Sequence, residues 1–426
     1  MNDEEDRHQI PALSFERLKV VSALGRGAKG VVFLVKDEDR DALLALKVIS
    51  KELIEKKGKS VNSDGNEYKR VCFEQGVLGL LRHPLLPRLR GILDTEKLVG
   101  YAIDYCPGRD LNVHRKRQTE RMFSDDVIRF YAAELVLALE YLHGIGIVYR
   151  DLKPENVMVQ ENGHIMLVDF DLSTKLSPKS PQSSRTSNFS DTESDSARKK
   201  RLSPFHRFCN SGITPEDSAS QNGLSDNSAR TELYSSEKSN SFVGTEEYVA
   251  PEIVSGNGHD FAVDWWSLGV MLYEMLYGET PFRGSNRKET FYRIVTKSPE
   301  LIGEPTPLRD LIRKLLEKDP KQRIGVEEIK GHDFFRGMDW DSVMQIPRPP
   351  YIPENVDEDK EGIRGIDVVS VVQGIFGVGG DCVEGDKQKT DQRGINGDHA
   401  ETVNTKDWVG SVPNHHPTQV DNFLVF

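Results

Sequence analysis

The stretch that most constrains this chain is the run Ile147-Val-Tyr-Arg-Asp-Leu-Lys-Pro-Glu-Asn156. Within six residues it places a carboxylate at Asp151, a lysine at Lys153 and an amide at Asn156. Thirteen residues further on, after an Asn-Gly turn and a short apolar run, comes Asp169. Phosphoryl transfer needs a carboxylate that takes the proton of the attacking hydroxyl, a lysine beside the transferred group, and oxygen ligands for magnesium. The alternative is a polar loop without chemistry, which would have to match four spacings in a fixed order by chance.

A glycine cluster near the N-terminus fits the same chemistry. A dinucleotide-binding turn would open a helix, and a Walker A loop would need Lys and then Ser or Thr after its last glycine, where this chain has Val31. A generic turn remains, as does a strand–turn–strand flap whose amides approach phosphates closely. The residues assigned to the flap follow the pattern GxGxxGxV and are Leu24, Gly25, Gly27, Gly30 and Val32.

One lysine lies in an otherwise apolar strand. Lys47 has apolar neighbours on both sides, although an isolated strand lysine is more often solvated. If it points inward, it needs an anionic partner, and Glu74 on a following helical segment is a suitable counter-charge.

The predicted secondary structure changes along the chain. The segments ERLKVVSAL, GVVFLVKD and ALLALKVIS are typical of strands. The segment DDVIRFYAAELVLALEYLHG has helical spacing with Ser124 as its N-cap, and TPLRDLIRKLLEKDP is an amphipathic helix that ends before Pro320. The expected architecture is α+β, with a small β-rich lobe followed by a larger helical lobe.

One segment interrupts this pattern. Residues 175–240 contain 17 serines and few aliphatic residues, a composition that cannot offset the entropy of ordering, so we expect a disordered insertion. Its basic cluster Arg198–Arg201 could address a nuclear carrier or an anionic membrane surface, or could be a solvated charge run. A second region of low hydrophobicity runs from about 355 to 420 and precedes the terminal residues FLVF.

These motifs together resemble the protein kinase family. GxGxxGxV, ALKV, Glu74, YRDLKPEN, DFD at 169–171 and Ala250-Pro-Glu252 match its motif set, which implies the bilobal kinase fold. The stretch SFVGTEEYVAPE and the terminal FxxF are similar to the AGC group of Ser/Thr kinases. A DFD triplet followed by a long insertion is typical of its plant members. The resemblance divides the chain into an extension (1–14), a kinase domain (15–335) and an AGC-type tail (336–426).

The resemblance also implies a role for individual residues, with ATP and Mg²⁺ as cofactors. Asp151 is implied as the catalytic base beside Lys153, with Asn156 and Asp169 as metal ligands. Lys47 would hold the nucleotide phosphates and pair with Glu74, while Asp104 to Cys106 would form the adenine-binding hinge, with Ile103 as gatekeeper. Protein substrates are implied to meet three acidic residues: Asp110, Glu155 and Glu274.

Regulation and bracing follow from the same resemblance. Ser241 matches the activation phosphosite, with Arg150 as its partner, and the terminal Phe423 and Phe426 match a docking motif for the phosphoinositide-dependent kinase. Docking of the motif on this chain's own small lobe is the alternative. The implied braces of the large lobe are a Glu252–Arg323 ion pair and Asp264 behind the catalytic loop.

Asp171 departs from the kinase pattern, which has glycine there. Metal binding belongs to Asp169, and aspartate tolerates unusual backbone geometry, so we interpret the loop as modified but working. The rival interpretation is a pseudokinase scaffold that keeps the fold without catalysis.

Charge and cysteine content limit the remaining classes. The net charge of -12 argues against nucleic-acid binding. Four scattered cysteines predict neither disulfides nor zinc, and the acidic N-terminus does not resemble a signal peptide. We therefore expect a soluble monomer in the cytoplasm, with the nucleus or peripheral attachment to anionic lipids of the plasma membrane as alternatives.

Overall fold

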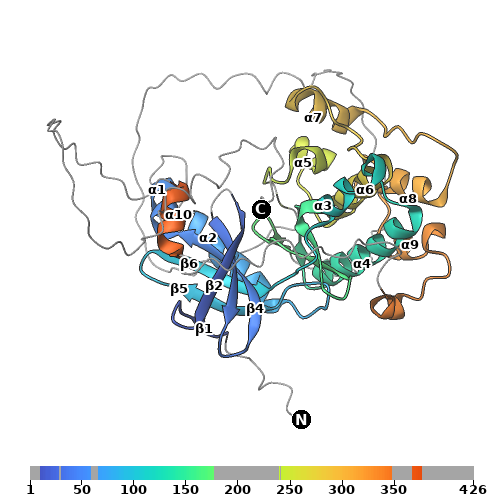
Figure 1. Ribbon diagram of the computed structural model, residues 1–426. Coiled ribbons are helices and arrows are strands. Elements are labelled where there is room, and N and C mark those ends of the chain that lie inside the picture. Colours follow the sequence, from blue (N-terminus) through green and yellow to red (C-terminus); the bar gives the residue numbers. More distant parts are fainter. Residues whose placement is uncertain are drawn as a thin grey trace, which may run out of the picture. The chain divides into compact units, whose positions relative to one another are not determined.

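The computed structural model describes residues 10–27, 30–58, 66–176, 239, 241–347 and 367–376. These residues form a β-rich N-lobe and a helical C-lobe, which confirms the expected α+β kinase fold (Figure 1). Most of the predicted insertion and the terminal Phe423 and Phe426 lie outside the described residues. No helix in the described ranges is long and apolar enough to cross a membrane.

The N-lobe is a six-stranded sheet in the order β1-β5-β6-β4-β3-β2. Neighbouring strands are antiparallel except for β1, which runs parallel to β5. The apolar and β-branched composition of these segments suits a sheet with apolar groups packed on it. The bounds are β1 Ala12–Leu13, β2 Leu18–Arg26, β3 Gly30–Asp37, β4 Ala42–Ser50, β5 Leu89–Asp94 and β6 Leu98–Asp104.

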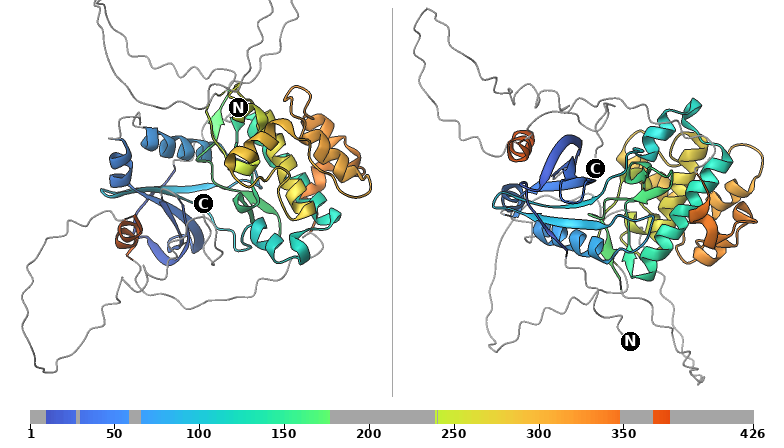
Figure 2. Two further views of the ribbon diagram at one scale, coloured as in Figure 1. Left: turned by 90° about the horizontal axis from the view of Figure 1, so that it is seen from above. Right: turned by 60° about the horizontal axis from the view of Figure 1, so that its bottom comes forward.

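Helices cover both faces of this sheet. Helices α1 (Lys51–Gly58) and α2 (Asn66–Leu80) lie on one side, and α10 (Val368–Phe376) lies on the other (Figure 2). The buried valines of α10 join a core cluster with Leu18, Phe33 and other sheet residues. The sequence analysis treated residues 355–420 as one region of low hydrophobicity and did not identify this helix. Averaging over that span hid a nine-residue apolar segment.

The C-lobe is built around two long helices. The predicted helix at Asp125–Gly144 is α4, and α6 (Ala262–Tyr277) packs against it. Ser124 does occupy the N-cap of α4, but its side chain makes no capping hydrogen bond. The predicted amphipathic helix is α8 (Pro307–Leu315), where Thr306 accepts a hydrogen bond from the Arg309 N–H. The other α-helices are α3 Leu111–Lys116, α5 Pro251–Val254, α7 Arg287–Thr296 and α9 Val326–Lys330.

Short strands frame the loops that carry the predicted catalytic residues. Strand β7 (Ile147–Val148) precedes the catalytic loop, and the hairpin β8 (Val157–Val159) with β9 (Ile165–Leu167) separates it from Asp169. Strand β10 (Thr174–Lys175) pairs with β7, so the first residue of the predicted insertion is part of the fold. Short 3₁₀ turns lie at Thr119–Arg121, Pro154–Asn156, Glu246–Tyr248, Asp333–Phe335 and Trp340–Gln345.

The ion pair implied for the C-lobe is present. Arg323 Nη1 lies 2.7 Å from Glu252 Oε1, and Nη2 lies 3.0 Å from Oε2, with both side chains buried. Arg323 also donates to the backbone carbonyl of Ala262 at the start of α6. The pair therefore ties the end of the activation segment to the helical core.

Replacing Arg323 with methionine should destabilise the protein strongly. The substitution leaves the buried Glu252 carboxylate without its cation, which costs about 3–5 kcal/mol. Urea unfolding of the full chain measures this loss. As a matched control, Arg336→Met removes a solvent-exposed pair with Asp333 and should leave the unfolding free energy nearly unchanged. Equal effects of the two substitutions would contradict the assigned role of the buried pair.

Candidate active site

The catalytic loop is held from behind by one buried carboxylate. Asp264 on α6 accepts hydrogen bonds from the backbone N–H groups of Tyr149 at 2.9 Å and Arg150 at 2.7 Å. The ring of His143 lies 2.8 Å from the same carboxylate. Arg150 has a φ of 70°, a conformation that non-glycine residues adopt at a cost. The two hydrogen bonds that Asp264 accepts hold this strained turn and so fix the direction in which the next residue, Asp151, points.

Asp151 lies at the centre of a compact polar group. Its Oδ2 accepts hydrogen bonds from Lys153 Nζ and Asn156 Nδ2, each at 2.9 Å. Thr245 Oγ1 in the activation segment donates to Asp151 Oδ1 at 2.8 Å, and Lys153 reaches Thr245 at 3.2 Å. The structure therefore brings together the predicted base and lysine, and it adds Thr245, whose contact with the base was not predicted.

One side of Asn156 is left for a ligand. Its Nδ2 is used by Asp151, but its Oδ1 is buried and has no hydrogen-bond partner among the described residues. A buried acceptor without a donor is costly unless something binds it. The backbone N–H of Val168 donates to the Asn156 carbonyl at 3.0 Å, which places Asn156 beside the strand that leads to Asp169. An amide oxygen and a carboxylate are the hard ligands that Mg²⁺ prefers, so these residues fit the predicted metal.

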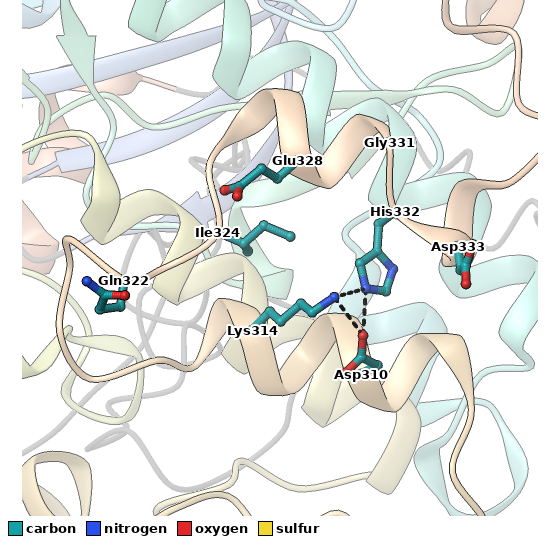
Figure 3. A pocket seen from close by; sticks show the side chains of 8 residues that line it. All are labelled: Asp310, Lys314, Gln322, Ile324, Glu328, Gly331, His332 and Asp333. Carbon is teal, nitrogen blue, oxygen red and sulfur yellow. Dashed lines mark hydrogen bonds and ion pairs between the residues drawn. The ribbon is translucent and has the colours of Figure 1, made fainter.

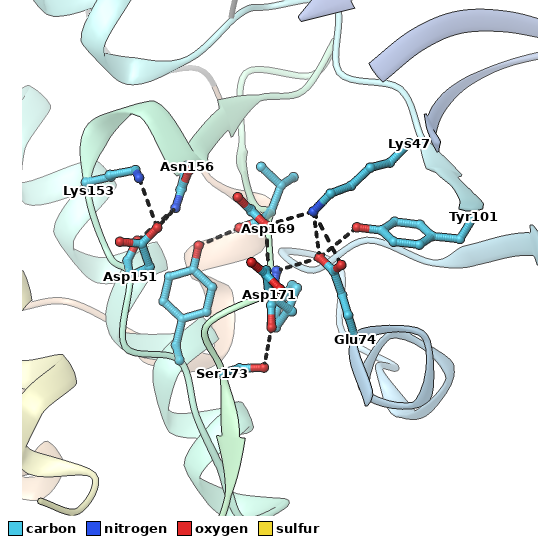
Figure 4. A network of polar contacts seen from close by, with 12 residues as sticks. Lys47, Glu74, Tyr101, Asp151, Lys153, Asn156, Asp169, Asp171 and Ser173 are labelled. Atoms are coloured by element: carbon cyan, nitrogen blue, oxygen red, sulfur yellow. Dashed lines mark hydrogen bonds and ion pairs between the residues drawn. The ribbon is translucent and has the colours of Figure 1, made fainter. Parts of the chain in front are cut away.

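Lys47 joins the two lobes (Figure 4). Its Nζ lies 3.0 Å from Glu74 on α2 and 3.0 Å from Asp169. The predicted Lys47–Glu74 pairing is thus present. The hydroxyl of Tyr101 on β6 donates to Glu74 at 2.7 Å, and the Phe170 N–H donates to the same carboxylate at 3.2 Å. The sequence analysis missed Tyr101, because a tyrosine in a strand is unremarkable by propensity.

Burial and mutual attraction set the charges of this group. Burial favours neutral Lys47, but Asp169 and Glu74 outweigh it and raise the lysine pKa well above its usual value. Burial also opposes ionisation of Asp169, yet Lys47 holds the pKa of that carboxyl below its usual range. Burial raises the pKa of Glu74, and Lys47 and the Tyr101 hydrogen bond offset only part of this. Asp169 is therefore the more firmly charged of the two carboxylates.

The residues around Asp171 correct one sequence expectation. The positive φ in this loop belongs to Asp169, at 60°, and Asp171 is not among the described residues with positive φ. Position 171 thus needs no special backbone tolerance, and the explanation based on such tolerance is wrong. The aspartate is accommodated because its backbone conformation is ordinary.

Tyr149 fastens this loop to the catalytic loop. Its buried hydroxyl donates to the Val168 carbonyl, and its ring meets that of Phe170 edge to face, with the ring centres 5.3 Å apart. The strand that delivers Asp169 is thereby fixed to the loop that carries Asp151.

The residues predicted to bind a nucleotide lie in the glycine-rich flap of β2 and β3 and in the hinge after β6, and their contact with a nucleotide stays a prediction. In the flap, Gly25 pairs with Val32 across β2 and β3, and the Gly27 N–H donates to the Gly30 carbonyl at 2.8 Å. A Cβ on Gly30 would meet the Val48 carbonyl at 2.4 Å, so only glycine fits this close approach. Leu24 is half-buried at the flap's start.

The hinge has one polar and one apolar residue at its ends. Asp104 accepts hydrogen bonds from Arg90 at 2.6 Å and from the Arg88 N–H at 3.0 Å. Cys106 is buried in a small apolar cluster with partly buried Ile103, and burial raises the pKa of its thiol to about 12. Cys106 is therefore a packing residue rather than a reactive thiol.

The predicted substrate-binding carboxylates are already engaged. Asp110 is 2% exposed and caps α3 by accepting from the Val113 N–H at 2.9 Å, and burial raises its pKa to about 6. Glu155 accepts from Asn112 at 2.8 Å, and Glu274 pairs with Arg115 at 2.7 Å. The structure adds a capping role for Asp110, and the contacts of all three with substrate stay predictions.

The predicted phosphosite lies beside its predicted arginine. Arg150 Nη1 donates to Ser241 Oγ at 2.6 Å and to Ser239 Oγ at 3.1 Å, and lies 3.3 Å from His259 Nε2. Burial lowers the pKa of Arg150 to about 10, Asp264 opposes this shift, and the positive charge of Arg70 on α2 adds to it. Arg150 therefore holds a positive charge directly against the hydroxyl of Ser241.

A separate polar hollow of about 430 Å³ lies between α8 and α9 (Figure 3). At one end His332 contacts both Asp310, at 3.0 Å, and Lys314, at 3.2 Å. The hollow shares no lining residue with the predicted site. Its lining is Asp310, Lys314, Gln322, Ile324, Glu328, Gly331, His332 and Asp333.

These contacts are the arrangement expected of a protein kinase. Lys47 pairs with Glu74, and Asp151 is held by Lys153 and Asn156. A protein kinase domain model matches residues 18–194 and 220–335. Serine/threonine-protein kinase OXI1 of Arabidopsis thaliana is 60% identical over 99% of this chain and 100% of that protein. Serine/threonine-protein kinase UCN of the same plant is 43% identical over 82% of this chain and 87% of that protein. Phototropin-2 of Oryza sativa subsp. japonica is 40% identical over 79% of this chain and 34% of that protein.

The chain belongs to the protein kinase family, within the plant AGC group of serine/threonine kinases. It is a serine/threonine-protein kinase, as the motif set predicted. The stretches YAIDYCPGRDLN, RFCNSG and DNFLVF resemble the oxidative-signal-inducible kinase, and the 60% identity to OXI1 confirms that resemblance.

Replacing Tyr101 with phenylalanine should shift the pH dependence of activity. The hydroxyl's hydrogen bond lowers the pKa of Glu74, so its loss raises that pKa further. Glu74 must be ionised to pair with Lys47, and it protonates as the pH falls through its pKa. The acid limb of kcat/KM should therefore move to higher pH, while activity at alkaline pH stays close to that of the wild type. Superimposable pH profiles for the two proteins would contradict the role of Tyr101.

Proposed function

We propose that this kinase transfers the γ-phosphoryl group of ATP to serine or threonine hydroxyls of proteins through Asp151, Lys153, Asn156, Asp169 and Lys47. The observation that carries the proposal is that Lys47 forms ion pairs with both Glu74 and Asp169, each at 3.0 Å. These ion pairs align a cation from the sheet with Asp169, which directly follows Val168, the residue whose N–H donates to the Asn156 carbonyl. Phosphoryl transfer requires a cation and metal-ligating oxygens close together.

Each residue has a distinct task in this proposal. Asp151 orients the substrate hydroxyl and accepts its proton, and the bonds from Lys153 and Asn156 hold its carboxylate in place. Lys153 neutralises charge on the transferred group, and Lys47 holds the nucleotide phosphates. Asn156 and Asp169 would hold magnesium, which supplies charge neutralisation on the phosphate oxygens when bound. Thr245, which now contacts Asp151, would orient the base until the acceptor hydroxyl takes its place.

Asp151→Asn should lower kcat by about 100-fold to 10,000-fold, the usual contribution of a general base. The amide keeps the shape of the side chain but cannot take the proton. Magnesium-dependent autophosphorylation and transfer to a peptide measure the loss. Asp341→Asn, an exposed aspartate at the edge of the C-lobe, is the matched control and should keep full activity. A wild-type protein that binds ATP without transferring phosphate would instead favour the pseudokinase scaffold.

The activation step is proposed to act through Ser241. A phosphate there would meet Arg150, which already contacts the hydroxyl, and would lie in the field of Arg70. Arg70 and Glu74 are one helical turn apart on α2, so a phosphate that attracts Arg70 also steadies Glu74 against Lys47. Phosphorylation would thereby link the activation segment to the cation that binds ATP.

Recruitment of the upstream kinase is proposed to use the terminal FxxF. Two phenylalanines in a polar tail suit a binding motif, and the phosphoinositide-dependent kinase is the partner that the AGC resemblance implies. A Phe423→Ala, Phe426→Ala double variant should slow phosphorylation of Ser241 by that kinase by about tenfold or more, since it loses two buried rings. Phosphosite-specific detection over time measures the rate, with Val412→Ala as the matched control. An unchanged rate would favour docking of the motif on this chain's own small lobe.

Substrate choice and cellular role complete the proposal. A preference for basic residues before the acceptor would use Glu155 and Glu274, and the existing Arg115–Glu274 pair shows that this carboxylate accepts a guanidinium. A cytoplasmic location, with nuclear or anionic-lipid targeting through Arg198–Arg201, is proposed from the charge pattern alone. A role in stress or defence signalling rests on the family resemblance.

A further inference from the structure

Helix α10 is an apolar segment in an otherwise polar tail. Its valines 368, 371 and 372 are 4%, 6% and 0% exposed, and they pack against the sheet face opposite α2. The side chain of Asp367 fixes the start of the helix, with Oδ1 accepting from the Val369 N–H at 3.0 Å and Oδ2 from the Ser370 hydroxyl at 2.6 Å. The helix thus has a defined position on the N-lobe.

The far end of α10 reaches the glycine-rich flap. Arg26 Nη2 donates to the Ile375 carbonyl at 3.2 Å, and its guanidinium lies 5.3 Å from the centre of the Phe376 ring. An arginine over an aromatic ring within about 6 Å is an attractive cation–π pair. One flap residue therefore holds both a C-terminal carbonyl and the last aromatic ring of the helix.

Because Arg26 belongs to the glycine-rich flap, its contact with α10 bears directly on the position of the flap. Arg26 is the last residue of β2 and lies between Gly25 and Gly27 of the GxGxxGxV pattern. It pairs with Val31 across the hairpin, and Val31 belongs to the same core cluster as the α10 valines. The contact therefore acts within the flap, at the last strand pair before its turn and on the sheet face that α10 covers.

We infer that Arg26 is a positioning residue that couples α10 to the phosphate-binding flap, so that the docked tail helix favours ATP binding. A flap made of glycines has many conformations to lose when it closes on phosphates, and a tether at the strand pair next to its turn reduces that loss before the nucleotide arrives. The inference rests on the proposed contact of the flap with ATP phosphates. It makes the tail a determinant of the KM for ATP, without any direct contact between α10 and the nucleotide.

The test compares Arg26→Ala, Phe376→Leu and the double variant in the full chain. Each single variant should raise the KM for ATP by about threefold to tenfold, the size expected for one exposed cation–π or charged hydrogen-bond contact, with kcat changed less. The double variant should show little further increase, because both substitutions remove one contact. Lys19→Ala, an exposed lysine on the same strand, is the matched control and should keep the wild-type KM.

Three results would overturn the coupling. The first is a KM that stays at the wild-type value while thermal stability falls, which would make the contact purely structural. The second is a KM for ATP that rises in Arg26→Ala but not in Phe376→Leu. The third is a double variant whose KM rises by the product of the two single effects. If Arg26→Ala does not fold, Arg26→Lys, which keeps the charge but loses the planar guanidinium, takes its place. A wild-type protein without saturable dependence on ATP would contradict the proposed function rather than the coupling.

Discussion

The arrangement of the candidate active site depends on the two ion pairs of the Lys47 ammonium group. The ammonium group lies between two carboxylates that come from different parts of the chain, Glu74 on α2 and Asp169 after β9. Without it, two buried negative charges would repel each other across the junction of the lobes, and burial would drive protons onto them. One side chain therefore fixes α2, the sheet and the loop of Asp169 relative to one another. The hydroxyl of Tyr101 adds a hydrogen bond to Glu74, the carboxylate whose pKa is raised.

A second layer of contacts gives the catalytic loop its shape. Asp264 holds two backbone N–H groups, Tyr149 joins the loop to the strand before Asp169, and Thr245 brings the activation segment to Asp151. These contacts connect α6, the catalytic loop and the activation segment. A movement of the activation segment would therefore change the hydrogen bond from the Thr245 hydroxyl to Asp151. The proposed phosphate on Ser241 would lie four residues before that hydroxyl along the chain.

The sequence predicted the fold, and it predicted that the proposed catalytic residues lie together, because their spacing is rigid. The loop from Asp151 to Asn156 is too short for its groups to separate, and the charge of Lys47 in an apolar strand required a partner such as Glu74. Contacts between distant segments carry no such signal. Thr245 and Tyr101 reach their partners only through the tertiary fold, and the capping role of Asp110 depends on where α3 begins. Asp171 was misjudged because the family pattern assigns the unusual backbone to the third residue, whereas here Asp169 adopts it.

The position of α10 changes what counts as the folding unit. The family match ends at residue 335, yet the apolar face of the sheet that carries Leu18, Val31 and Phe33 is covered by a helix that begins 33 residues later, at Val368. The sheet and α10 bury each other's apolar side chains, so a polar substitution in either would leave apolar surface of the other exposed. The unit that packs together is therefore longer than the part of the chain that the protein kinase domain model matches, and its last piece, α10, is separated in sequence from the sheet residues that it covers.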